Sequence, residues 1–163
     1  MALLLIFLFL KSCSEPVSQD YSDNSSEELF SKAEGYFEEG NYSLARNGFE
    51  KLFESFRDSD GNITIKSLEY LSILAKKRGD DQKASHFLNQ ILDVDHPRSR
   101  VSYFMGWARL HRINSDDINA INSANSALSQ MKQVGEEISL NSAEMELLLG
   151  GIFKSRGEFE LAY

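Results

Sequence analysis

The stretch from Ala33 to Leu52 constrains the fold most, because it predicts two short helices that fold back on each other. Its centre is Gly40, a residue type that accepts the positive φ needed where a helix stops and the chain reverses. The small residues Ala33 and Ala45 allow the two helix backbones to approach closely. Large side chains at helical spacing fill the space beside them, namely Tyr36, Phe37, Phe49 and Leu52.

These residues, together with Leu29, resemble a tetratricopeptide repeat, a helix–turn–helix unit of about 34 residues. Lys32 stands where that family has leucine, and Arg57 where it has the closing proline. The resemblance implies antiparallel helix pairs that stack on one another.

The pattern recurs three more times along the chain. The second unit comprises Leu68, Leu71, Ser72, Ala75, Gly79-Asp80-Asp81, Ala84, Leu88, Ile91 and Pro97. The third comprises Gly106, Leu110, a turn near Asn114-Ser115-Asp116, and Ala120, Ala124 and Ala127; the fourth comprises Leu149, Gly150, Phe153, Gly157 and Ala162. The extra length between Gly40 and Gly79 is expected in a turn-rich loop from Asp58 to Asn62.

The sequence therefore predicts an all-α, tetratricopeptide-like α-solenoid of about three to four repeats, the last one incomplete. The expected repeats are 26–59, 65–98, 99–133 and 143–163, within a helical domain of residues 26–163. An ordinary all-α domain of amphipathic helices is the alternative interpretation.

The N-terminus carries a nearly unbroken apolar run from Ala2 to Leu10, followed by Lys11-Ser12-Cys13. The run suits the apolar region of a signal peptide, which spans about 7–15 residues. Ser12-Cys13 resembles the lipobox of bacterial lipoproteins, which implies lipidation of Cys13. A cleaved signal without lipidation and a buried helix are the alternatives.

Residues 14–25 are polar and acidic, as expected of a tether that follows a signal peptide of residues 1–13. We therefore expect a chain that is lipid-anchored in a bacterial cell envelope, at the outer membrane or the periplasmic face. A secreted or periplasmic protein is the alternative.

Charge is distributed unevenly over the 163 residues, whose net charge is −8. The stretch from Gly61 to Arg112 is basic and contains Lys76-Lys77-Arg78, Arg98, Arg100, Arg109 and Arg112. These cations predict attraction of an acidic partner segment; solvated helix ends are the alternative explanation. Nucleic acid is not expected as a partner, because the chain as a whole is acidic.

Residues with catalytic or metal-binding chemistry are scattered. His86, His96 and His111 have no carboxylate or cysteine at ligand spacing. The acidic pairs Asp80-Asp81 and Asp116-Asp117 stand where helix N-caps are expected. We therefore expect no enzyme, no metal, no cofactor and no small-molecule substrate.

In tetratricopeptide proteins the first helix of each repeat lines a concave groove that holds a partner segment. Carried over to this sequence, the groove positions are Phe30, Glu34 and Phe37, then Glu69, Ile73 and Lys76, then Tyr103, Trp107 and Leu110. For Tyr103 and Trp107, packing in the core is the alternative. The resemblance implies a non-enzymatic scaffold for protein–protein interaction.

A narrower likeness joins Cys13, Gly40-Asn41-Tyr42, His96-Pro97 and Tyr103 with Gly106. In this order they resemble BamD-type lipoproteins, which help to insert β-barrels into bacterial outer membranes. The alternative function is the helical regulatory or substrate-binding part of a longer enzyme or secretion component.

Overall fold

The computed structural model describes residues 25–136, 139–158 and 161. The expected signal peptide with Cys13, the expected tether up to residue 24, and Ala162 lie outside these residues. Within the described part, seven α-helices and one short 3-10 helix follow one another. They are α1 (Ser26–Glu38), α2 (Tyr42–Phe56), α3 (Gly61–Lys77), α4 (Asp81–Gln90), η1 (Ile91–Asp93), α5 (Ser99–Ile113), α6 (Asp117–Gln133) and α7 (Leu140–Ser155).

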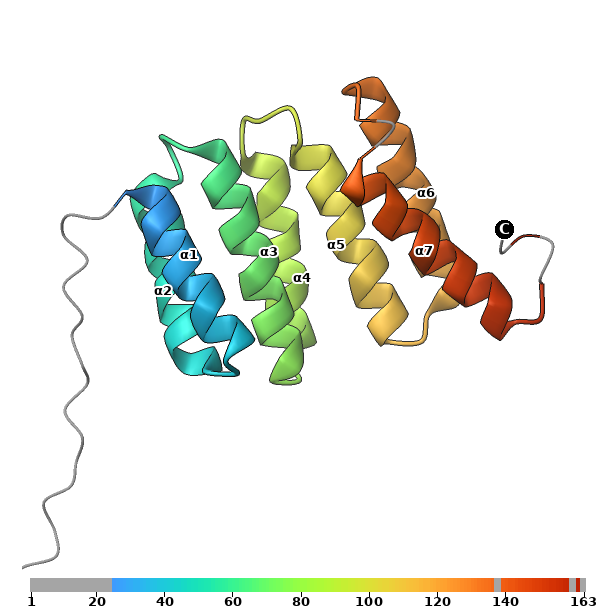
Figure 1. The fold of residues 1–163 in the computed structure, drawn as a ribbon, viewed down its shortest axis with the longest axis horizontal. Helices are drawn as coiled ribbons and strands as arrows, with labels where there is room; N and C mark the ends of the chain where they lie inside the picture. Colours follow the sequence, from blue (N-terminus) through green and yellow to red (C-terminus); the bar gives the residue numbers. More distant parts are fainter. Residues whose placement is uncertain (1–24, 137–138, 159–160, 162–163) are drawn as a thin grey trace, which may run out of the picture.

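The helices form a row of antiparallel hairpins (Figure 1). Helices α1, α3, α5 and α7 stand side by side on the near side of the molecule, and α2, α4 and α6 stand behind them. The prediction of an all-α arrangement of helical repeats is confirmed. Among the described helices, none is both long enough and apolar enough to span a bilayer.

The turn that follows each of α1, α3, α5 and α7 contains one residue with positive φ. Gly40, Gly79 and Gly157 have φ between 76° and 78°. The third hairpin uses Ser115 instead, with a φ of 59°. Ser115 therefore marks the position that glycine holds in the other units, and it provides a register for comparing the four units.

Aspartates cap three of the helices, α3, α4 and α6. The backbone N–H groups of Ile63, Lys83 and Asn119 donate to the carboxylates of Asp60, Asp80 and Asp116, respectively. The caps predicted at Asp80 and Asp116 are confirmed. The expected loop from Asp58 to Asn62 is too long, because the cap at Asp60 starts α3 at Gly61. The extra length of this unit thus lies in the helices.

The first hairpin packs as its small residues predict. Ala33, Ala45, Phe49 and Leu52 are all buried in one apolar cluster, where half-buried Tyr36 packs against them. A methyl group added at Gly48 would come within 2.8 Å of Ala33 Cβ, so α1 and α2 are in close contact there. Phe49 also stacks on Tyr70 of α3, with ring centroids 4.5 Å apart. The core therefore continues from the first hairpin into the second.

Counting from the turn residues shows how well the units repeat. Seven positions before the turn, a small residue occurs in every unit: Ala33, Ser72, Ala108 and Gly150. Five positions after the turn, alanine is buried in the first three units, as Ala45, Ala84 and Ala120. In the third unit the expected turn near Asn114-Ser115-Asp116 and the buried Ala120 are confirmed, whereas Gly106, expected as part of the pattern, lies two residues before the small residue Ala108.

Gly106 is explained by the packing of α5 against α4. A methyl group there would lie against the side chain of Leu88 in α4, so this glycine admits the buried leucine of the preceding unit. Leu88, Ala84 and Ile91 are buried in the second apolar cluster, together with Leu110. The packing between α4 and α5 thus needs a glycine two positions before the small residue of the repeat.

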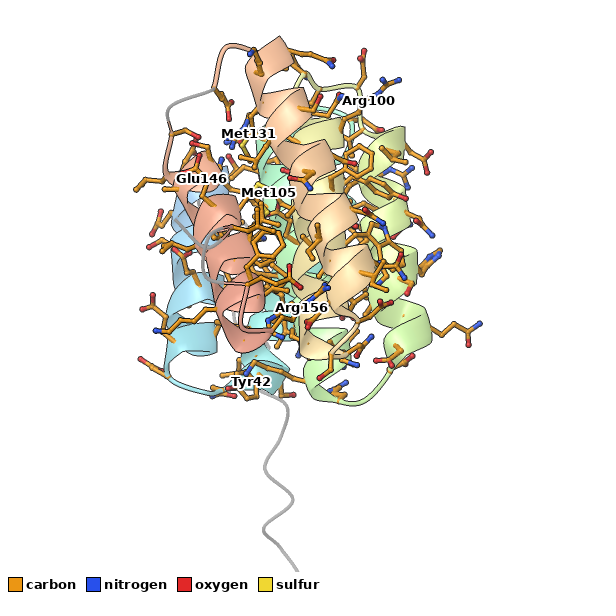
Figure 2. All side chains as sticks on the ribbon, turned by 90° about the vertical axis from the view of Figure 1, so that its right-hand side faces the viewer. Tyr42, Arg100, Met105, Met131, Glu146 and Arg156 are labelled. Atoms are coloured by element: carbon orange, nitrogen blue, oxygen red, sulfur yellow. The ribbon has the colours of Figure 1, made fainter. Side chains whose placement is uncertain are left out.

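The last cluster joins α5, α6 and α7 around Met105, Met131 and Met145. Figure 2 views this end of the molecule, with α7 in front and Met105 between helices. Leu140 and Leu147 of α7 remain largely exposed. An open hollow of about 860 Å³ lies over the outer face of α7, lined by Leu147, Leu149 and Phe153 among others.

Candidate partner-binding groove

The near face of the row in Figure 1 is formed by the first helix of each hairpin. The predicted groove positions of the first two units lie ten, six and three residues before the turn residue. The same spacing, counted from Ser115 and Gly157, gives the positions in the other units. The groove residues are then Phe30, Glu34 and Phe37 of α1; Glu69, Ile73 and Lys76 of α3; Met105, Arg109 and Arg112 of α5; and Leu147, Gly151 and Lys154 of α7.

The predicted groove positions of the third unit differ from this set. Tyr103 and Trp107 pack beside the second apolar cluster, and Leu110 is a buried member of that cluster. Trp107 stacks on His111 with ring centroids 5.2 Å apart. For Tyr103 and Trp107 this is the core-packing alternative weighed from the sequence, whereas Leu110, although buried, also lines a hollow beside Ile73 and Lys76.

The α1 section of the groove is closed by aromatic packing. Tyr70 of α3 contacts Phe30 and Phe37 edge to face, at centroid distances of 5.8 and 5.1 Å. Its hydroxyl donates a 2.6 Å hydrogen bond to Oε1 of Glu34. Burial of the ring, followed by the hydrogen bond to Glu34, raises the pKa of Tyr70 well above its usual value, which keeps the hydroxyl as a donor. Glu34 therefore ties α1 to α3.

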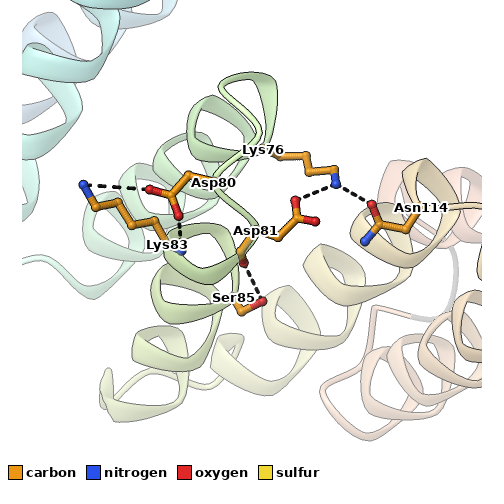
Figure 3. A network of polar contacts seen from close by, with 6 residues as sticks. All are labelled: Lys76, Asp80, Asp81, Lys83, Ser85 and Asn114. Atoms are coloured by element: carbon orange, nitrogen blue, oxygen red, sulfur yellow. Dashed lines mark hydrogen bonds and ion pairs between the residues drawn. The ribbon is translucent and has the colours of Figure 1, made fainter.

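Lys76 joins two neighbouring turns at the end of the groove where the turns lie (Figure 3). Its ammonium group lies 2.6 Å from Oδ1 of Asp81, at the start of α4. It also donates a hydrogen bond to Asn114, in the turn that follows α5. Lys76 thus links the second unit to the third while it keeps a cation at the groove face.

Two hollows meet at Glu69 and Arg109 in the centre of the groove. The larger one measures about 290 Å³ and is lined by residues of α3, α5 and α7, with Arg98 from the start of α5. The smaller one lies toward the turns, between Ile73, Lys76 and Ile113. Glu69 and Arg109 line both hollows. They are therefore the two charged groups that the whole central groove shares.

Arg109 is held by a carboxylate from the last helix. Its Nε and Nη2 atoms donate to the two carboxylate oxygens of Glu144, each over 2.7 Å. This paired geometry matches a planar guanidinium to a carboxylate and is stronger than a single hydrogen bond. The contact spans the groove from α5 to α7.

Glu69 lies in a less favourable environment. Burial raises the pKa of its carboxyl group above the ordinary value, and the nearby Glu144 raises it further. Arg109, the hydroxyl of Ser102 and Arg98 act in the opposite direction without cancelling the effect of burial. Glu69 therefore holds its proton to a higher pH than an exposed glutamate does.

Sequence reasoning recognised Arg98, Arg109 and Arg112 as part of a basic strip, but it did not assign Arg109 to the groove. It also missed Glu144 and Tyr70. The signal for Arg109 was its position six residues before Ser115, inside the turn expected near Asn114-Ser115-Asp116. Glu144 shares no local pattern with Arg109, because the two lie 35 residues apart.

Metal-ligand chemistry does not gather anywhere in the described residues: no group of three or more His, Cys, Asp or Glu side chains is placed to hold an ion. Comparison with known proteins adds no assignment. No protein-family model matches the chain, and no curated protein matches it either.

Proposed function

We propose that this chain is a non-enzymatic scaffold for protein–protein interaction that binds a segment of a partner protein in its groove. The observation that carries the proposal is the central groove itself, where a hollow lined by α3, α5 and α7 and a smaller one lined by α3, α4 and α5 meet at Glu69 and Arg109. Charged, polar and apolar side chains lie together there, as in surfaces that recognise peptide segments. A small residue recurs seven positions before the turn residue in all four units, which supports kinship with tetratricopeptide repeat proteins.

The proposal includes the place where the scaffold works. Ser12-Cys13 after the apolar run supports a lipid anchor on Cys13, in a bacterial envelope lipoprotein at the outer membrane or the periplasmic face. Residues 14–25 then serve as a tether between lipid and repeats. The likeness to BamD-type lipoproteins suggests a role beside envelope assembly machinery.

Site-specific photo-cross-linking in the source organism tests the groove. A photoreactive amino acid replaces Ile73, which lines the smaller hollow, or Asn89, which is exposed on α4 behind the groove. We expect a discrete protein adduct from position 73 and none of that mass from position 89. Adducts of equal yield from both positions would count against a groove-binding scaffold.

Radiolabelled palmitate tests the anchor in a bacterial host. We expect the native chain to carry the label in the membrane fraction and Cys13→Ser to lose it, because lipidation needs the thiol. A single acyl chain gives only marginal membrane binding, so stable retention implies several chains. Equal labelling of the two chains, or no label in either, would contradict the lipoprotein proposal.

A further inference from the structure

The centre of the groove already contains a bound carboxylate, which belongs to the chain itself. Both carboxylate oxygens of Glu144 accept hydrogen bonds from Arg109, and neither side chain is fully buried. The bonds to Glu144 use two of the five N–H donors of a guanidinium. A carboxylate that enters along the groove can therefore approach Arg109 from solvent.

The cations around this position outnumber the carboxylates that the groove provides. The larger hollow has Lys66, Arg98 and Arg109 on its walls against the one carboxyl group of Glu69. That carboxyl group is partly buried among them, and burial favours its protonated form. Lys66 is also held above the ring of Phe30, with Nζ 5.4 Å from the centroid.

The cations are balanced by carboxylates that reach in from other segments. Glu136, which follows α6, lies 3.0 Å from Nε of Arg98, and Asp117 of α6 lies 3.0 Å from Nη1 of Arg112. Glu144 provides the same balance for Arg109. Arg98 at the N-cap of α5 and the α5 residues Arg109 and Arg112 thus each lie beside an internal carboxylate, and this arrangement is the one that an acidic ligand would reproduce.

We propose that the partner segment is acidic and that one of its carboxylates replaces Glu144 on Arg109. Glu144 then acts as an internal competitor, which keeps the guanidinium paired when no partner is bound and lowers the affinity for weakly acidic segments. The inference rests on the proposed function, because it names the chemistry of the segment that the groove binds. Exchange of one carboxylate for another leaves no unpaired charge at the site.

Fluorescence anisotropy on the full chain tests the exchange. The probe is a fluorescein-labelled peptide of alternating Glu and Ser, and a second peptide with Gln in place of every Glu is its neutral counterpart. Glu144→Gln removes the competitor, and we expect it to bind the acidic peptide about fivefold more tightly than the native chain does. Glu146→Gln is the matched control, since Glu146 is exposed on the same helix away from Arg109; it should change the affinity less than about twofold.

A double-mutant cycle identifies Arg109 as the group that is released. Arg109→Gln should weaken binding of the acidic peptide, and adding Glu144→Gln to it should restore nothing, although the double variant has the net charge of the native chain. Circular dichroism checks that each variant remains helical. Equal gains from Glu144→Gln and Glu146→Gln, or a gain that persists without Arg109, would overturn the exchange.

The neutral peptide separates this inference from the proposed function. If both peptides bind the native chain equally and Ile73→Ser weakens both, the groove binds segments and the acidic preference is wrong. If neither peptide binds the native chain or Glu144→Gln, the inference is overturned, whereas a cross-link from position 73 would still support the scaffold.

Discussion

At the scale of single residues, the molecule depends on a few charged side chains in partly buried positions. The ionised form of Glu69 is destabilised in the groove centre, because burial disfavours the charge more than Arg109, Ser102 and Arg98 stabilise it, and the pKa of the carboxyl group is raised. The charge of Arg109 is stabilised, since its guanidinium group donates two hydrogen bonds to Glu144. A charge on Glu69 therefore lowers the stability of the fold, whereas the paired charge of Arg109 is compatible with it.

Glu69→Gln should stabilise the fold at neutral pH. A raised pKa means that ionised Glu69 is unfavourable in the folded state, whereas the unfolded chain ionises near the ordinary value of 4.5. The penalty is absent below that value, grows as the pH rises toward the folded-state pKa, and is complete above it. Thermal melts should show the variant melting higher than the native chain at pH 7, with the difference vanishing toward pH 4.

Glu54→Gln is the control for this measurement, because Glu54 is exposed on α2. A gain at pH 7 that matches the control, or one that persists unchanged at low pH, would show that the burial of Glu69 carries no cost.

At the scale of elements, the turns explain both what the sequence predicts and where the prediction fails. Gly40 and Gly79 were recognisable as turns, and both have the positive φ that this interpretation requires. In the third hairpin a serine adopts that conformation, while Gly106 serves a contact with Leu88. The turn expected near Asn114-Ser115-Asp116 is thus confirmed, and counting from it puts Met105 and Arg109, rather than Tyr103 and Trp107, at the spacing of the groove positions in the first two units.

Glycines inside helices provide a matched test of how the first hairpin packs. Gly48→Ala should destabilise the fold by about 1–3 kcal/mol, because the new methyl group meets Ala33 Cβ in a packed interface. Gly35→Ala adds the same methyl group to α1, where no heavy atom lies within 4 Å. It should stabilise the fold by up to about 1 kcal/mol through helix propensity.

Urea denaturation of both variants and the native chain measures the two effects. If Gly48→Ala were as stable as Gly35→Ala, the close contact between α1 and α2 would be wrong.

At the scale of the whole molecule, the stacking of hairpins turns local repetition into one continuous face. Side chains at a constant distance from four turns fall on α1, α3, α5 and α7, and the central helices provide most of the cations. The all-α repeat arrangement followed from the sequence pattern. The contact of Arg109 with Glu144 could not be predicted from the sequence pattern. It depends on where α7 lies relative to α5, and the two helices are separated in the sequence by α6.

The measurement that tests the account most directly is an NMR titration of the isotopically labelled full chain with the acidic peptide. We predict that the largest chemical-shift changes fall on the groove residues of α3, α5 and α7, including the Nε–H signal of Arg109 as it exchanges one carboxylate for another. Changes centred on α2, α4 and α6 would contradict the account.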